Sequence, residues 1–461
     1  MLRPPLATRY AHRHDSAPAP LGPDILMPLP FDCRSLVTER AVHRAVYTDA
    51  QIFAVEQDRI FRRVWLYVGH DSQVPEAGDW IRTRLGPEEM ILIRCEGGGL
   101  SLLHNRCPHR GAQLVSAASG RARQLVCSYH AWSFSPEGRL TGLPLPEGYG
   151  ASFSMAAPGR SVERAPRLES YRGFVFASHA ASGPSLQEAL GGLAFAIDNL
   201  VDRAPQGRVR PIGGTLRMMY RGNWKLFMEN AVDLIHPGFV HASAVGAARA
   251  DRDAAQAGGV TGQVVQMQLA NGLRPAEWDA LQIHAYPGGH VSMDSFYRQG
   301  VIAAQREDPV FKRYFDSLVA VHGPERAQAI VAVDRFNNLL WPTLSVNSRF
   351  QAIRVIEPLA VDLTRVSSMC FALEGAPEEM SELSLRFLTA AASPGSLVAA
   401  DDLDMFERCQ RGLQSGEADW IDISRGMEGD QVSRSETLSP GTSELSIRSQ
   451  LAAWQHWMSR P

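Results

Sequence analysis

The sequence lacks any long apolar run. No stretch approaches the ~18–20 consecutive apolar residues of a membrane-spanning helix, and its first thirty residues carry arginine, histidine and proline instead of the apolar core of a signal peptide. Basic excess is also missing, because 46 lysines and arginines face 49 aspartates and glutamates, for a net charge of -3. This balance gives no electrostatic footprint for nucleic acid or an anionic membrane. We therefore expect a cytoplasmic protein with neither partner.

Cysteine is scarce, with 6 residues in 461, which excludes a disulfide scaffold. Two of them, Cys107 and Cys127, have a histidine close by. The others are expected to be ordinary thiols: Cys33, Cys95, Cys370 and Cys409. The chain also has no GxGxxG or Walker loop, so it is not expected to bind a dinucleotide or triphosphate of its own.

Length and pattern predict several domains with an α+β second half. Residues 1–37 are rich in Pro, Ala and Arg without a period and predict an N-terminal arm. The amphipathic pattern of residues 38–64 predicts a helical lead-in that packs on the larger, second domain (residues 181–461). Short β-type runs separated by Gly, Pro and Asn predict a small all-β domain over residues 65–180. Residues 181–461 mix strands and helices, which favours an antiparallel sheet with helices on one side.

Individual segments of the second half carry more specific predictions. Strands are expected at residues 262–270 (GQVVQMQLA), 281–289, 344–358 and 364–375. Helices are expected over residues 377–415 and from residue 442 to the end.

Two cysteine–histidine pairs predict a metal site in the all-β domain. Cys107-x-His109 is followed, after seventeen residues, by Cys127-x-x-His130. Tetrahedral zinc is one interpretation of such a Cys₂His₂ set. Because cysteine precedes histidine in both pairs, the two thiolates can instead take one iron and the two imidazoles the other. That is the ligand set of a Rieske [2Fe–2S] centre, which we favour.

A second cluster of potential ligands lies about a hundred residues later. Glu229, Asp233 and His236 stand at i, i+4 and i+7, so we expect them on one face of a helix. His241 follows five residues after His236, and the Pro-Gly pair between them supplies a distortion that can turn both imidazoles toward one ion. Alone, such a histidine pair is weak evidence, since paired histidines are often ordinary helix residues.

A carboxylate would complete the 2-His-1-carboxylate set of mononuclear non-haem iron. Asp401, Asp402 and Asp404 begin a predicted helix, where acidic residues also occur simply as N-terminal caps. The pattern alone leaves the choice among the three open.

Together these motifs resemble the large (α) subunit of the Rieske non-haem iron, ring-hydroxylating oxygenases. The resemblance covers roughly residues 45–461 and rests on CPHRG, CSYHAW, the NWK…EN…D..H….H segment and DDLDMFERCQRGL. It implies a Rieske domain set against a helix-grip (START-like) catalytic domain. It selects Asp402 as the carboxylate ligand beside His236 and His241, with Glu407 as the matching glutamate of the motif. One departure is Ile235, where many members carry tyrosine.

The resemblance also implies partners and a role for Asp233. Electrons from NAD(P)H would reach the [2Fe–2S] cluster through a separate reductase, with or without a ferredoxin, and pass to mononuclear Fe(II), which activates O₂. Asp233 would hydrogen-bond His236 and, across a subunit boundary, His130 of a neighbouring subunit. A homotrimer is therefore expected, alone or with a small β subunit as α₃β₃.

The function that follows is the terminal oxygenase component of a ring-hydroxylating dioxygenase. The sequence after Gly323 looks most like members that act on aromatic acids. Arg349 and Arg354 are candidates to pair with a substrate carboxylate, and strand alternation places Arg354 on one face with Ala352 and Ile356. A structural or solvated arginine is the competing interpretation. Two alternatives remain for the whole chain: a Rieske monooxygenase or demethylase acting on a quaternary amine or methoxy-aromatic compound, and a non-catalytic Rieske electron carrier.

Overall fold

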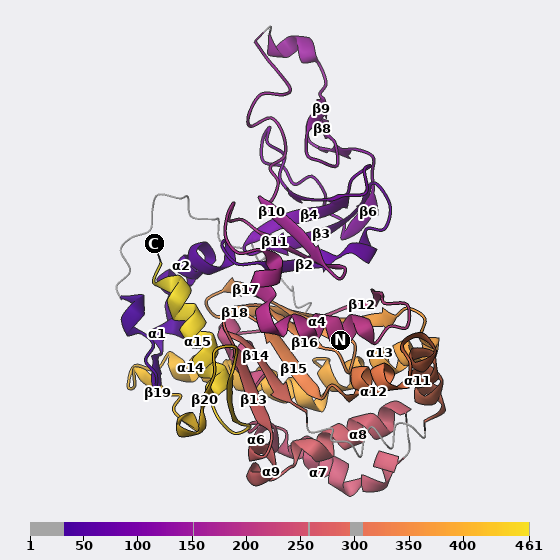
Figure 1. The fold of residues 1–461 in the computed structure, drawn as a ribbon. Helices are drawn as coiled ribbons and strands as arrows, with labels where there is room; N and C mark the ends of the chain where they lie inside the picture. Colours follow the sequence, from indigo (N-terminus) through magenta and orange to yellow (C-terminus); the bar gives the residue numbers. More distant parts are fainter. Residues whose placement is uncertain (1–31, 151, 257–258, 296–307, 461) are drawn as a thin grey trace, which may run out of the picture.

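A computed structural model describes residues 32–150, 152–256, 259–295 and 308–460 of the chain. It consists of a smaller β-rich lobe above a larger α+β lobe (Figure 1). Most of the expected N-terminal arm lies outside the described residues; its end includes a short 3₁₀ helix, Cys33–Ser35. Within the described residues, no helix combines the length and apolar character needed to cross a bilayer.

The smaller lobe is built from short antiparallel strands around a core of its own. A four-stranded sheet has the order β5-β4-β3-β6, and the three-stranded sheets have the orders β7-β8-β9 and β10-β11-β2. Its core includes Trp80, Ile91, Trp132 and Phe134, all buried. The strands are β2 Leu66–His70, β3 Asp79–Leu85, β4 Glu88–Arg94, β5 Leu100–His104, β6 Ser119–Arg121, β7 Leu125–Val126, β8 Ser133–Phe134, β9 Leu140–Gly142, β10 Arg167–Tyr171 and β11 Phe174–Ser178.

The larger lobe contains a nine-stranded sheet with the order β12-β18-β17-β16-β15-β14-β13-β21-β20. Neighbouring strands pair antiparallel throughout this sheet, as the sequence predicted. A separate short pair joins β1 to β19. The strands are β1 Ala41–His43, β12 Val209–Tyr220, β13 Gln282–Tyr286, β14 His290–Asp294, β15 Arg335–Leu340, β16 Leu344–Asn347, β17 Ala352–Ala360, β18 Leu363–Leu373, β19 Trp420–Asp422, β20 Gln431–Val432 and β21 Thr437–Pro440.

Helices surround this sheet (Figure 1). They are α1 Ala45–Thr48, α2 Ala50–Glu56, α3 Leu186–Leu190, α4 Phe195–Asp202, α5 Trp224–Asn230, α6 Pro237–Val240, α7 Ala242–Ala250, α8 Gly259–Asn271, α9 Pro275–Asp279, α11 Pro309–His322, α12 Pro324–Ala332, α13 Glu378–Ala392, α14 Leu397–Leu413 and α15 Leu445–Met458. The helical region expected over 377–415 is therefore two helices, because Pro394 and Gly395 lie between them.

The strand expected at residues 262–270 is wrong, since these residues belong to α8. Val264 and Met267 stand three residues apart on this helix and pack against Phe387 of α13 and Val398 of α14. The apolar residues of this segment therefore serve one helical face, and packing against neighbouring helices overrides the β propensity of its valines.

A buried ion pair anchors α5, the helix before the second predicted metal site. Glu56 at the end of α2 and Lys225 of α5 are buried and lie 2.5 Å apart. The indole N–H groups of Trp224 and Trp454 both donate to the Glu56 carboxylate. Because every charge in this cluster is paired and hydrogen-bonded, α2, α5 and α15 are held in a fixed arrangement.

Candidate metal centres

The two cysteine–histidine loops of the smaller lobe have the same backbone geometry. Gly111 and Ala131, each four residues after a cysteine, donate their N–H groups to the carbonyl oxygens of Cys107 and Cys127, at 2.9 Å in both loops. Both adopt a left-handed backbone, with φ 75° at Gly111 and 52° at Ala131. A left-handed alanine is strained, so the surrounding loop must hold it in place.

The side chains of these loops separate into an inner and an outer pair. Cys107 and Cys127 are buried, whereas His109 and His130 are partly exposed. The two imidazole rings lie 4.7 Å apart between centroids. Trp132 stacks on His109 at 4.7 Å with an interplanar angle of 3°, and its indole donates to the Tyr149 hydroxyl. This packing fixes the orientation of His109.

Electrostatics at the inner pair suit bound thiolates. Burial raises the pKa of Cys107, and the adjacent Cys127 thiol raises it further, so two free thiolates would repel each other here. The N–H groups of His109 and Arg110 act in the opposite direction by hydrogen-bonding the Cys107 sulfur. Two thiols facing inward and two imidazoles facing outward fit a cluster with one sulfur-bound and one histidine-bound iron.

The second set of predicted ligands converges in the larger lobe. One side-chain ligand atom each from His236, His241 and Asp402 lies within 4.8 Å of the other two. Oδ1 of Asp402 is 3.7 Å from Nε2 of His236 and 3.5 Å from Nε2 of His241. The three residues come from two segments, the stretch around α6 and the helix α14. Three donors on one side of an ion are the arrangement of the facial triad, which leaves positions open for O₂.

Neighbouring side chains orient these three donors. Nδ1 of His241 lies 3.4 Å from a carboxylate oxygen of Asp401, and Nδ2 of Asn230 donates to Oδ1 of Asp402 at 3.2 Å. A carboxylate behind a histidine fixes its tautomer and leaves Nε2 free for a metal. Sequence reasoning missed the roles of Asp401 and Asn230, because no local pattern shows which side chains lie behind a ligand.

Glu229, Asp233 and His236 do not lie on one helix, so that expectation is wrong. Helix α5 ends at Asn230, and Oδ1 of Asp233 accepts the N–H groups of Ile235 and His236, which bends the chain before α6 begins at Pro237. Glu229 is separated from the set and instead accepts a hydrogen bond from Tyr47. Burial raises the pKa of Glu229 to about 7.

The three aspartates do not cap their helix either. Helix α14 begins at Leu397 with Ser396 as its N-cap, so Asp401 and Asp402 lie in the second turn. Asp404 is exposed and pairs with Arg408 at 2.7 Å. Glu407 lies apart from the cavity and accepts a hydrogen bond from Arg411.

The candidate triad opens into a cavity of about 110 Å³. Its apolar wall comes from α8, α13 and the loop before β17. Phe350 of that loop stacks on Phe387 of α13, with ring centroids 4.0 Å apart. Its polar wall comes from the sheet: Asn337, Ser345, Asn347 and Arg354. A mainly apolar cavity with a few fixed polar groups is typical of a small-molecule site.

Arg354 lines this cavity, as strand alternation predicted, whereas Arg349 lines a neighbouring one. Among the described residues, the Arg354 guanidinium forms no hydrogen bond or ion pair. Burial lowers its pKa, and the charge of Asp402 opposes that shift. Arginine stays protonated at neutral pH, so the cavity wall carries a positive charge that no described side chain pairs with at hydrogen-bond distance.

Comparison with known proteins finds a matching family for each of the two lobes. Residues 64–161 match the Rieske [2Fe-2S] domain, and residues 206–459 match the catalytic domain of the ring hydroxylating alpha subunit. The large subunit of 2-halobenzoate 1,2-dioxygenase from Burkholderia cepacia is 31% identical over 83% of this chain and 79% of its own length. The large subunit of anthranilate 1,2-dioxygenase from Acinetobacter baylyi is 30% identical over 84% of this chain and 80% of its own length.

A solved structure shares the fold. Naphthalene 1,2-dioxygenase with indole bound superposes with a TM-score of 0.78 over 93% of this chain and 95% of that one, at 23% identity. The matched Rieske domain decides between zinc and a [2Fe–2S] cluster as the cofactor of the smaller lobe, in favour of the cluster.

Proposed function

Since this chain belongs to the ring-hydroxylating oxygenase α-subunit family, with a Rieske [2Fe–2S] domain before a catalytic domain with mononuclear iron, we propose that it is the terminal oxygenase of a dioxygenase system for a small aromatic acid. A reductase would supply electrons from NAD(P)H. In this proposal the lead-in spans residues 38–64, the Rieske domain 65–180 and the catalytic domain 181–461.

The observation that carries the substrate class is the unpaired Arg354 guanidinium in the cavity beside the candidate triad. Leaving a buried charge unpaired costs several kcal/mol, and a carboxylate would satisfy the guanidinium through two parallel hydrogen bonds. The cavity volume of about 110 Å³ is well below the ~300–1,000 Å³ of drug-sized pockets. A compact aromatic acid is therefore favoured over a polycyclic substrate, and the curated relatives that act on halobenzoate and anthranilate support this choice.

We assign the ligands residue by residue. Cys107 and Cys127 would hold one iron of the cluster, and His109 and His130 the other. His236, His241 and Asp402 would hold the mononuclear iron, with Asp401 as a positioning residue for His241. When bound, the two centres supply electrons and activation of O₂. The chain's own contribution is to hold the substrate through Arg354, orient its ring between Phe350 and the triad, and keep open coordination positions.

Asp233 suits a connection between two subunits. Its hydrogen bonds with the described residues all use Oδ1, which leaves Oδ2 for another donor. His236 Nδ1 lies 3.8 Å from Oδ1 and has no hydrogen-bond partner among the described residues. The partner subunit's His130 would supply the second donor, so that Asp233 links two metal-bound imidazoles.

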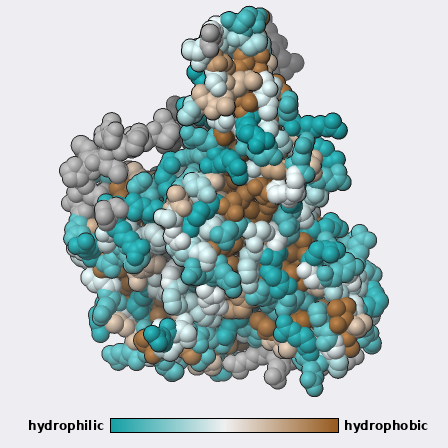
Figure 2. Space-filling model, turned by 45° about the horizontal axis from the view of Figure 1, so that its top comes forward, coloured by the Kyte–Doolittle hydropathy of each residue, from teal (hydrophilic) through white to brown (hydrophobic). Residues whose placement is uncertain are grey.

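The surface of the smaller lobe favours this assembly. Apolar side chains are visible at its projecting end in Figure 2, and its exposed large apolar residues include Val126, Tyr129 and Leu145, at 51%, 57% and 73%. Val126 directly precedes Cys127, and Tyr129 lies between Cys127 and His130. Apolar side chains beside a cluster ligand indicate a contact surface, and a trimer, with or without a β subunit, would cover it.

Replacing Arg354 by methionine should weaken binding of aromatic acids by roughly 30-fold, corresponding to about 2 kcal/mol for the loss of one partner of a buried charge pair. Titrations of the wild type and the variant with an aromatic acid and its neutral amide would measure this. The wild type should prefer the acid, and the variant should lose that preference. Arg349→Met is the matched control and should retain it. Equal affinity of Arg354→Met and wild type for every acid tested would remove the basis for the proposed substrate class.

Replacing His130 by cysteine should lower the reduction potential of the cluster, because a thiolate adds negative charge to the histidine-bound iron. Redox titration followed by electron paramagnetic resonance would measure the shift. The wild-type protein should be brown and contain acid-labile sulfide. A protein that contains one zinc and no labile sulfide per chain would contradict the ligand assignment.

A further inference from the structure

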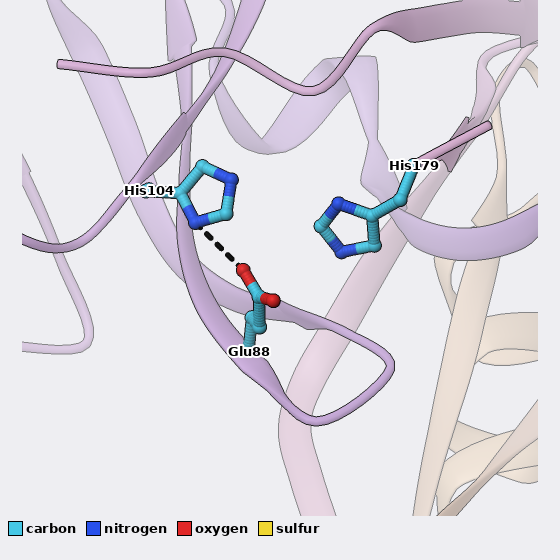
Figure 3. A group of neighbouring side chains, drawn as sticks. All are labelled: Glu88, His104 and His179. Atoms are coloured by element: carbon cyan, nitrogen blue, oxygen red, sulfur yellow. Dashed lines mark ion pairs between the residues drawn. The ribbon is translucent and has the colours of Figure 1, made fainter. Parts of the chain in front are cut away.

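A third group of potential ligands lies in the smaller lobe and shares no residue with either proposed centre. It consists of Glu88 at the start of β4, His104 at the end of β5 and His179 just after β11 (Figure 3). One ligand atom from each residue lies within 4.8 Å of the other two. The three residues are partly exposed, so an ion in solution can reach them.

The hydrogen bonds of these three residues leave a ring nitrogen of each histidine available to a metal ion. Nδ1 of His104 lies 2.8 Å from Oε2 of Glu88, the pair joined by the dashed line in Figure 3. Arg62 pairs with the other oxygen of Glu88. Nε2 of His179 lies 3.3 Å from the carbonyl oxygen of Leu85. Nε2 of His104 and Nδ1 of His179 have no hydrogen-bond partner among the described residues.

The protonation states of Glu88 and His179 also favour the binding of a cation. Burial opposes ionisation of Glu88, but the hydrogen bond and charge of His104 and the charge of Arg62 outweigh it and hold the Glu88 pKa at about 2. Burial lowers the pKa of His179, so this imidazole is neutral at pH 7. An anionic carboxylate beside a neutral imidazole is the ligand form that metals require.

We propose that Glu88, His104 and His179 form a third metal site, which binds a divalent ion of the zinc type. Two histidines and one glutamate are a known zinc ligand set, with water as the fourth ligand. Zinc bonds of ~2.0–2.2 Å imply ligand atoms about 3.3–3.6 Å apart in a tetrahedral site. His104 and Glu88 are already closer than that, so the ion replaces the proton between them and His179 moves inward by a rotation of its side chain.

The position of the site indicates what the ion does. His104 precedes Cys107 by three residues, and its carbonyl oxygen accepts the N–H of Arg106 at 2.8 Å. His179 directly follows β11, a strand of the sheet β10-β11-β2, whereas Glu88 and His104 belong to the four-stranded sheet. A bound ion therefore links the two sheets and holds the residue from which the chain enters the Cys107 loop.

The test is zinc titration of the untagged, iron-loaded full-length protein by calorimetry, with iron and zinc counted after desalting. The wild type should bind one zinc per chain more than His179→Asn or Glu88→Gln, and zinc should raise the melting temperature of the wild type but not of these two variants. Variants that keep their brown cluster and iron content are folded. His456→Gln and Cys409→Ser, which remove other potential zinc ligands, should bind zinc as the wild type does.

Two results would overturn the third site. In the first, the wild type binds no more zinc than His179→Asn and Glu88→Gln do. In the second, the extra zinc appears only as iron is lost, which would place it at the proposed iron ligands. Neither readout depends on turnover, so failure here is distinguishable from failure of the proposed oxygenase function.

Discussion

The substitution Asp402→Ala is expected to remove the mononuclear iron and abolish oxygenation while leaving the Rieske spectrum unchanged. Oδ1 of Asp402 faces Nε2 of both histidines, at 3.7 and 3.5 Å, and two neutral imidazoles alone offset none of the charge of Fe(II). Losing a direct ligand should cost more than the ~10–100-fold in affinity that losing an outer partner typically costs. Iron analysis, absorption spectra and product formation would measure the three effects.

Substitutions of the neighbouring Asp401 and Asp404 are the controls for iron loss in Asp402→Ala. Asp404→Ala should keep its iron, because Asp404 is exposed and pairs with Arg408. Asp401→Ala should weaken iron binding by ~10–100-fold without abolishing it, since Asp401 orients His241 from behind. Iron retained in Asp402→Ala but lost in the Asp401 or Asp404 variant would show that the ligand has been assigned to the wrong residue.

The substitution Asp233→Asn is expected to leave both metal centres populated. It should slow electron transfer between them by ~100-fold or more, which corresponds to an activation barrier raised by about 2.7 kcal/mol. Asparagine keeps an oxygen for the N–H groups of Ile235 and His236, so the local turn survives. It replaces the free carboxylate oxygen by an NH₂ group, which cannot accept a hydrogen bond from a metal-bound imidazole. Stopped-flow oxidation of the reduced cluster in a single turnover would measure the rate.

Asp404→Asn is the matched control for this substitution and should react at the wild-type rate. A cluster that is oxidised equally fast in Asp233→Asn and in the wild type would refute the bridging role. Loss of iron in Asp233→Asn would instead make the residue a structural support of the site.

Local spacing explains why the four proposed cluster ligands and two of the three proposed iron ligands could be grouped from the sequence. The Cys107–His109 and Cys127–His130 pairs each lie within one loop, and His236 and His241 lie only five residues apart. The helix expected through Glu229, Asp233 and His236 failed because hydrogen bonds to Oδ1 of Asp233 end the regular spacing before Pro237. Periodicity assumes an unbroken helix, and a side chain that binds its own backbone removes that assumption.

Features that depend on distant segments could not be predicted. Residues 262–270 form a helix because α13 and α14 cover one of its faces, which no local pattern reveals. The contact of Asp401 with His241 spans 160 residues, and Glu88, His104 and His179 share no motif. Arg354 could be named as a candidate because strand alternation, which is local, places it on one face of β17 with Ala352 and Ile356.

The most direct test of the account is a single turnover of the reduced, iron-loaded protein with ¹⁸O₂ and a panel of compact aromatic acids. We predict that the cluster is oxidised only when an acid is bound, and that both oxygen atoms of one labelled O₂ appear in a dihydroxylated product. Label in a single product oxygen, with a quaternary amine or methoxy-aromatic compound as the only substrate, would assign the chain to the monooxygenases or demethylases. Cluster oxidation without any labelled product would contradict an oxygenase function altogether.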